Sequence, residues 1–187
     1  MSLVLAIDPG LRNLAFCVMN EKGEVLHIHK DDIFHGATIV LADVFYKIYD
    51  WCHTHKNLFD ECDNVVCEKQ FADAKLVLSS SLLIVETVIH CFAKSKFLSV
   101  HAMSVKRAYS TYTGEYRKNK TMAIQRAQSI CPTLFLSTND TKKIDDMCDA
   151  FLLAHYYTFH LSQHMRISRA ETKEGHNNNN HDHDDEN

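Results

Sequence analysis

The stretch VLAIDPGLRNLAFCVMN, residues 4–20, places one carboxylate, Asp8, between two apolar runs. Short apolar runs bounded by turn residues predict buried strands, and Pro9 and Gly10 supply the turn between them. A side chain at the end of such a strand is held rigidly, and the turn leads the chain away so that the carboxylate oxygens stay free. A single Asp in this position is also an ordinary turn residue, so the meaning of Asp8 depends on the rest of the chain.

The sequence after this stretch alternates between strand and helix signals. Gly23 marks a second turn, so a third strand is predicted from about Glu24 and the chain opens as a β-meander. Thr38 is a candidate N-cap for the first helix, and residues 137–141 hold cap candidates for the last one. Periodicity predicts helices over 38–57, 74–93, 105–110, 119–130 and 144–161, and strands over 64–69 and 97–103. This order predicts an α/β fold: a mixed five-stranded sheet, an antiparallel meander followed by parallel strands, flanked by helices.

Acidic side chains stand in two further places where the local pattern favours an apolar residue or an end. Glu68 closes the short apolar run NVVCE, and the last predicted helix carries Asp145, Asp146 and Asp149 beside an apolar stripe. Asp149 lies four residues after Asp145 and three after Asp146, so either pair shares one side of the helix. Each of these signals alone fits a solvated surface residue. Their joint occurrence, in this order, in one small α/β chain is far less ordinary.

Carboxylates gathered in one site repel each other, and the pKa of one of them rises unless a cation neutralises them. Hard divalent ions bind carboxylate oxygens, and Mg²⁺ combines a few protein carboxylates with water and phosphate oxygens. Two such ions about 4 Å apart can activate a water molecule and stabilise the leaving oxygen in phosphodiester cleavage. A role as metal ligand would explain why a buried strand ends in Asp8.

The net charge of −4 is unevenly distributed. The last 12 residues, HNNNNHDHDDEN, hold four acids and no Lys or Arg, so the rest of the chain is neutral overall. We expect one domain over residues 1–165 and a disordered acidic, His- and Asn-rich tail over 166–187, because the tail's final segment has nothing apolar to bury. Between Val105 and Arg126, six basic residues accompany one acid and alternate with tyrosines. This pattern suits a nucleic-acid backbone and unstacked bases, although a solvated charged face is the other interpretation.

The seven cysteines are scattered and form no CxxC pair. This distribution indicates reduced thiols and an intracellular protein in a reducing compartment. The N-terminus has no charged start followed by an apolar secretory stretch, and the longest apolar region, 76–93, is interrupted by serines and Glu86. We therefore expect neither a signal peptide nor a membrane span.

A strand Asp, a strand Glu and a helical DxxD, on a meander followed by alternating helices and strands, resemble the RNase H-like superfamily. Within it, the chain resembles the RuvC-like Holliday-junction resolvases, particularly those of large DNA viruses such as poxviruses. The matching motifs are AIDPG at 6–10, VVCEKQF at 65–71 and DDMCDAFLLA at 145–154. SVKRAYSTYTG at 104–114, with the basic residues that follow it, is similar to the family's substrate-facing segment.

The resemblance implies a Mg²⁺-dependent endonuclease, with two ions in each active site and Mn²⁺ as a substitute. Such an enzyme cuts four-way DNA junctions symmetrically as a homodimer during DNA recombination, and a viral member would act where the viral DNA is replicated in the host cell. The helix at 74–93 is apolar on more than one face, so it can pack on the sheet and on a partner subunit; full burial within the core is the other interpretation.

The resemblance also assigns roles to individual residues. Asp8, Glu68, Asp146 and Asp149 are implied as catalytic metal ligands, with Asp146 chosen over Asp145 because of the family's i, i+3 spacing. Phe71, three residues after Glu68, matches an aromatic residue that wedges into the junction centre. Lys106 and Lys120 match basic positions that contact DNA. The expected DNA-binding set is Phe71, Lys106, Arg107, Arg117, Lys118 and Lys120.

Several alternatives remain open at this point. An actin-like or sugar-kinase-type ATPase also begins with a strand and a DxG phosphate loop, but it needs further glycine-rich loops, and the five glycines here form no second DxG. A non-catalytic junction-binding protein could use the same fold, as could a nuclease acting on flaps or RNA–DNA hybrids. The pairs His27/His29 and His53/His55 raise the question of zinc, but no Cys or His set nearby in sequence completes a site.

Overall fold

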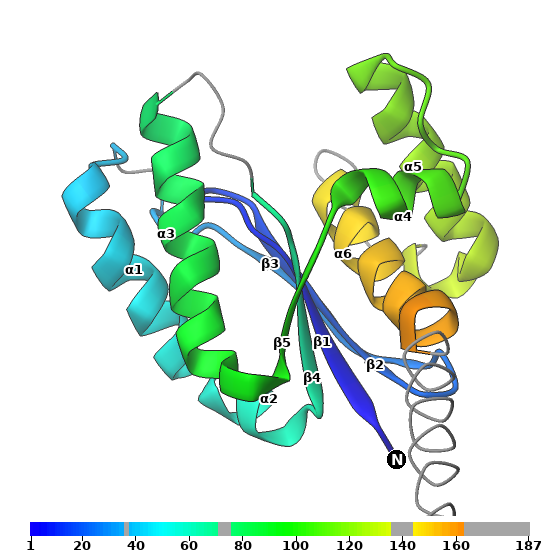
Figure 1. Ribbon diagram of the computed structural model, residues 1–187. Helices are drawn as coiled ribbons and strands as arrows, with labels where there is room; N and C mark the ends of the chain where they lie inside the picture. Colours follow the sequence, from blue (N-terminus) through cyan, green and yellow to red (C-terminus); the bar gives the residue numbers. More distant parts are fainter. Residues whose placement is uncertain (36–37, 71–75, 136–143, 163–187) are drawn as a thin grey trace, which may run out of the picture.

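A five-stranded sheet lies between two layers of helices in the computed structural model, which describes residues 1–35, 38–70, 76–135 and 144–162 (Figure 1). The strands are β1 (Leu3–Asp8), β2 (Leu14–Asn20), β3 (Val25–Asp31), β4 (Asn64–Glu68) and β5 (Phe97–Val100). Their order in the sheet is β3-β2-β1-β4-β5. β1 pairs antiparallel with β2, and β2 with β3, whereas β4 lies parallel to both β1 and β5. The predicted mixed sheet is therefore confirmed.

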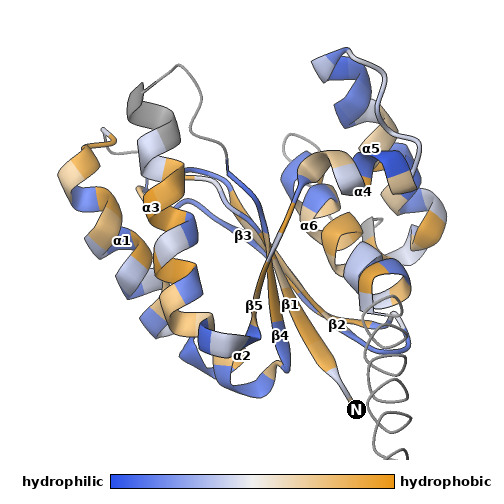
Figure 2. Cartoon of the chain, viewed as in Figure 1, coloured by the Kyte–Doolittle hydropathy of each residue, from blue (hydrophilic) through white to orange (hydrophobic). Residues whose placement is uncertain are grey.

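Each face of the sheet has its own hydrophobic core. One face packs against α1 (Leu41–Thr54), α2 (Lys56–Glu61) and α3 (Leu76–Ala93), and α1 and α3 lie side by side (Figure 1). The other face packs against α6 (Ile144–Tyr156), which is flanked by α4 (Ala102–Ala108) and α5 (Tyr116–Ile130). β2 is buried along its whole length because both faces are covered, which explains its continuous apolar run. Apolar colour likewise runs along most of β1 in Figure 2, at the centre of the sheet.

Several boundaries differ from those that the periodicity predicts. Strand β5 ends at Val100 instead of residue 103, because His101 begins the turn into α4. The expected helix over 38–57 is two helices, with His55 between them in a non-helical conformation. Thr38 is not the N-cap of α1: that residue is Val40, which makes no side-chain cap hydrogen bond. Helix α5 starts at Tyr116, three residues before the predicted start, which brings Tyr116 onto the helix.

The last helix continues beyond α6 as a single turn of π-helix, η3 (Tyr157–Leu161). Two short 3₁₀ segments, η1 (Lys94–Lys96) and η2 (Pro132–Phe135), end α3 and α5. The cap candidates at 137–141 and the tail lie outside the described residues. Among the described helices, none is long and apolar enough to cross a membrane. All seven cysteines are free thiols.

Candidate active site

Asp8 and Glu68 end two neighbouring parallel strands. Ile7 of β1 pairs with Cys67 of β4, so the residues that follow them, Asp8 and Glu68, leave the sheet at the same edge. The turn after Asp8 is tight: a side chain at Gly10 would place its Cβ 2.7 Å from the carbonyl oxygen of Asn13. Any residue larger than glycine would therefore push this turn apart and move Asp8.

Helix α6 brings the remaining acids to this edge. It packs across β1 and β2 through a buried side that includes Cys148 and Phe151, and this packing points its first two turns toward the ends of β1 and β4. Asp146 and Asp149 then line one pocket of about 270 Å³ together with Asp8 and Glu68. The other lining residues are Pro9, Gly10, Leu11, Arg12, Asn13, Lys106, Tyr116, Asn119 and Lys120.

The carboxylates in this pocket are electrostatically unfavourable when all are ionised. Desolvation raises the pKa of Asp8 well above its usual value, and the charges of Glu68, Asp149 and Asp146 raise it further. Desolvation also raises the pKa of Glu68, against the opposing effect of Lys106. The pKa of Asp149 is raised to about 7, by desolvation first and by Glu68 second. Mutual repulsion in a shielded site of this kind is relieved by a cation.

The residues present fit a divalent cation. Carboxylate oxygens are the donors that Mg²⁺ and Mn²⁺ prefer, and the side-chain oxygen of Asn13, on the same pocket, is buried and has no hydrogen-bond partner. A buried acceptor of this kind suits a cation or a water molecule bound to one. Among the described residues, no three His, Cys, Asp or Glu side chains are already oriented around a single ion position. An ion would be held after rotation of these carboxylates.

Asp145 is separated from the other acids by its own partner. Its carboxylate forms an ion pair with Lys120 of α5, and it does not line the pocket. Although partial burial acts to raise it, the pKa of Asp145 is lowered by the hydrogen bond and charge of Lys120. The basic neighbour of Asp145 in the described structure is thus Lys120, and Lys142 lies outside the described residues.

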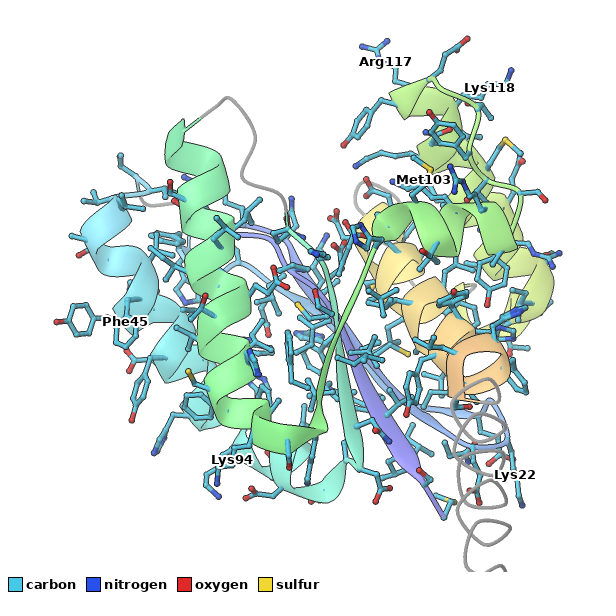
Figure 3. The ribbon with its side chains drawn as sticks, in the orientation of Figure 1. Lys22, Phe45, Lys94, Met103, Arg117 and Lys118 are labelled. Carbon is cyan, nitrogen blue, oxygen red and sulfur yellow. The ribbon has the colours of Figure 1, made fainter. Side chains whose placement is uncertain are left out.

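The expected DNA-binding residues divide into two groups. Lys106 and Lys120 line the carboxylate pocket. Arg107, Arg117 and Lys118 are exposed and do not line it, and Figure 3 shows Arg117 and Lys118 at the outer end of α5. Phe71, the expected wedge, lies outside the described residues. Gln70, the residue before Phe71, is described, and its backbone N–H is bound by Glu86.

Glu86 of α3 holds the chain directly after Glu68. One of its carboxylate oxygens accepts a hydrogen bond of 3.0 Å from the backbone N–H of Gln70, and the other accepts one of 2.6 Å from the hydroxyl of Ser99 on β5. The side chain of Gln70 in turn donates to the carbonyl oxygen of Glu68. Glu86 thus links α3, β5 and the end of β4, and it fixes the backbone two residues after Glu68.

The model of the family described as Poxvirus A22 protein matches residues 2–161. The chain belongs to this family. A search of curated protein sequences gives no significant match. The family match spans all four pocket carboxylates and both pocket lysines.

Two solved structures share the fold of this Poxvirus A22 family member. T. thermophilus RuvC in complex with a Holliday junction substrate is 15% identical, with a TM-score of 0.55; the match covers 87% of this chain and 96% of that one. The yeast mitochondrial Holliday junction resolvase Ydc2 is 17% identical, with a TM-score of 0.59, and the match covers 84% and 79% of the two chains. The resemblance that the sequence motifs indicated is confirmed in fold.

Four residues of the site were missed by the sequence analysis: Arg12, Asn13, Asn119 and Glu86. Asn13 stands five residues after Asp8, but an Asn after a turn carries no signal of its own. Glu86 interrupts an apolar helix, which in the sequence alone argues only against a membrane span. Tyr116 is one of the tyrosines among the basic residues, and only the fold gives it a place at the carboxylates. The histidines considered for zinc lie on the other side of the sheet, where His27 and His29 pack against the ring of Phe16.

Proposed function

We propose that this protein is a metal-dependent endonuclease that resolves four-way DNA junctions by hydrolysing phosphodiester bonds. The observation that carries the proposal is the meeting of Asp8, Glu68, Asp146 and Asp149, from three separate elements, in one pocket with two lysines on its wall. Without bound metal ions, four carboxylates in this arrangement would repel the phosphates of DNA. The family membership and the likeness to two resolvase structures support the same reaction.

In this proposal the four carboxylates hold Mg²⁺, two ions in each site, and Mn²⁺ can replace it. The bound ions would supply a polarised water molecule and charge stabilisation for the leaving oxygen. The chain itself provides the positions: β1 and β4 hold two carboxylates at rigid strand ends, and α6 holds the other two one turn apart. Asp146 and Asp149, rather than Asp145, serve as ligands because Asp145 is occupied by Lys120.

Lys106 and Lys120 would bind the phosphates on either side of the bond that is cut. Both ammonium groups act on the pocket carboxylates, since Lys106 lowers the pKa of Glu68 and both lysines lower that of Asp149. Arg107, Arg117 and Lys118 would extend this basic surface along the DNA backbone, where such contacts contribute affinity without sequence preference. Phe71 stays a prediction as the aromatic wedge at the junction centre.

The proposed substrate has two strands to cut, related by approximate two-fold symmetry. One active site in each subunit therefore requires a two-fold dimer. We also propose that the protein works in a reducing compartment, at the host-cell site of viral DNA replication; its seven free thiols are consistent with this. The division into a catalytic domain over 1–165 and a disordered tail over 166–187 stays a prediction, and the proposed reaction uses no residue of that tail.

The test is cleavage of labelled four-way junction, duplex, flap and RNA–DNA hybrid in Mg²⁺. We expect symmetric cuts in the junction and little cleavage of duplex. Asp8→Asn, Glu68→Gln and Asp146→Asn should each abolish cleavage while junction binding in Ca²⁺ is kept or strengthened, because negative charge near phosphate is removed. Asp145→Asn is the matched control, one residue from a ligand, and should retain most of the activity.

The outcomes separate the alternatives. Cleavage of flaps or hybrids in preference to junctions would make the protein a nuclease of a different specificity with the same metal site. Junction binding without cleavage under any divalent ion would make it a binding protein. Loss of activity in Asp145→Asn with activity kept in Asp146→Asn would move the ligand by one position.

A further inference from the structure

Tyr116 is an exposed aromatic residue on the wall of the carboxylate pocket. It is the first residue of α5, and 72% of it is exposed to solvent. The same pocket contains all four candidate metal ligands. Large aromatic rings in proteins are mostly covered, so a ring left open at this particular place has a surface available to a ligand of the site.

One charged side chain contacts the ring, and hydrogen bonds fix the backbone that leads into its helix. The ammonium group of Lys120, one helical turn further along α5, lies over it at 5.2 Å from the ring centroid. Lys120 is itself tied to α6 by its ion pair with Asp145. The loop before the helix is fixed as well, because the backbone N–H and the hydroxyl of Thr113 both donate to the side-chain oxygen of Asn119. The backbone that carries the ring is therefore ordered before binding, which lowers the entropic cost of stacking a base on it.

The other two tyrosines between Val105 and Arg126 differ from Tyr116 in their surroundings. Tyr109 is buried between α4 and α6, where its hydroxyl shares a hydrogen bond of 2.6 Å with His155, so it has a structural role. Tyr112 is 51% exposed but does not line the pocket. Of these tyrosines, Tyr116 alone combines exposure with a place beside the carboxylates.

We infer that Tyr116 is a stacking platform for an unpaired base next to the phosphate that is cut. The inference rests on the proposed function, and it adds the feature by which the site would select DNA with unpaired or easily opened bases. A ring face accepts any base, so it gives a preference for structure and not for sequence. Continuous duplex offers no free base face, and the platform would contribute nothing to its binding.

The experiment compares three variants: Tyr116→Ala, Tyr116→Phe and Tyr112→Ala. Affinity for a four-way junction is measured in Ca²⁺, with 2-aminopurine placed beside the scissile phosphate. Loss of one stacked base should weaken binding by about 5- to 150-fold, so we expect that loss in Tyr116→Ala and near wild-type affinity in the other two. The 2-aminopurine should be brighter with Tyr116→Ala than with wild type or Tyr116→Phe, because a base stacked on a ring is quenched. Affinity for continuous duplex should be the same in all four proteins.

Two results would overturn the platform. Wild-type affinity and fluorescence in Tyr116→Ala would show that no base stacks there, and an equal loss in Tyr116→Phe would assign the effect to the hydroxyl group. Melting temperatures of the variants check that they fold, which is expected because the ring is exposed. Failure of the proposed function looks different: wild-type protein would leave the junction uncut in Mg²⁺, whichever way the binding series turns out.

Discussion

Asp149 lies one turn into α6 with its carboxyl group desolvated and close to Glu68, so its pKa is raised to about 7 from a usual value near 3.8. An acid whose pKa is higher in the folded protein than in the unfolded chain binds its proton more tightly when folded. Its contribution to stability is therefore complete below about pH 4 and is lost as the pH rises through about 7. The raised pKa values of Asp8 and Glu68 act in the same direction.

We expect the melting temperature of the metal-free protein to fall between pH 5 and pH 8 on account of these groups. Asp149→Asn cannot ionise at this position and should flatten part of that fall, and divalent metal should restore stability most strongly at pH 8. Thermal unfolding in chelator and in Mg²⁺ measures both effects. Asp145→Asn is the control: the pKa of Asp145 is lowered, so its contribution is constant over this pH range. A pH dependence left unchanged by Asp149→Asn would contradict the assignment.

The sequence predicted those site residues whose chemistry conflicts with their surroundings. Asp8 and Glu68 end apolar strands, and the spacing of the helical acids limited the third and fourth members to two choices. Of these two, the structure places Asp146 on the pocket, whereas Asp145 meets Lys120, 25 residues earlier in the chain. Asn13 and Asn119 were not predictable because a polar residue in a turn or on a helix is ordinary, and only the folded arrangement makes them part of a pocket.

At the scale of elements, α3 supports the site as well as the core. Val85, Val88 and Ile89 are buried against the sheet, which explains the apolar character that the sequence showed. Glu86, on the same helix, faces the ends of β4 and β5 and binds Gln70 and Ser99. Strand and helix types followed from periodicity. The break at His55 and the early start of α5 did not, because they depend on packing between elements.

Glu86 gives a prediction at this scale. Glu86→Ala removes two hydrogen bonds that fix the chain beside Glu68, so we expect a roughly 10- to 100-fold loss of cleavage and a need for more metal, as for other residues that orient metal ligands. Glu86→Gln can still accept from the N–H of Gln70 and bond to Ser99, and it should keep most of the activity. Cleavage rates measured over a range of Mn²⁺ concentrations test both variants.

The neighbouring Thr87, exposed and bonded only within its own helix, provides the control variant Thr87→Ala. Equal damage from Glu86→Gln and Glu86→Ala would show that the charge matters and not the two hydrogen bonds. Normal cleavage by Glu86→Ala at low metal concentration would remove the supporting role altogether.

At the scale of the whole molecule, the two helical layers differ in what they leave open. The layer of α4, α5 and α6 carries the pocket and the basic residues. The layer of α1 and α3 carries an exposed aromatic group on α1, which consists of Phe45, Tyr46 and Tyr49. The ring centroids of Tyr49 and of Phe92 on α3 are 5.4 Å apart. Figure 3 shows Phe45 pointing away from the body of the protein. DNA binding and subunit contact can thus use opposite sides of the sheet.

The proposed dimer is therefore expected to form through α1 as well as α3. Tyr46 is 68% exposed and Phe45 48%, and clustered apolar side chains of this kind mark contact surfaces. The double variant Phe45→Glu, Tyr46→Glu places charges on this surface without touching the core, so it should fold and be monomeric in light scattering. Leu26→Glu is the matched control, since Leu26 is a 51% exposed apolar residue that belongs to β3 and not to the helices α1 and α3, and it should stay dimeric.

Junction cleavage gives the functional consequence of the same variant. A monomer carries one active site, so it should cut one strand of a four-way junction and release nicked intermediates, whereas a dimer cuts both strands within the lifetime of one complex. A supercoiled cruciform plasmid distinguishes the two, because a single cut gives nicked circles and a paired cut gives linear DNA. If the double variant remains a dimer that yields linear product, the aromatic group of α1 is not the interface; a wild-type protein that is strictly monomeric with and without junction DNA would remove the dimer itself.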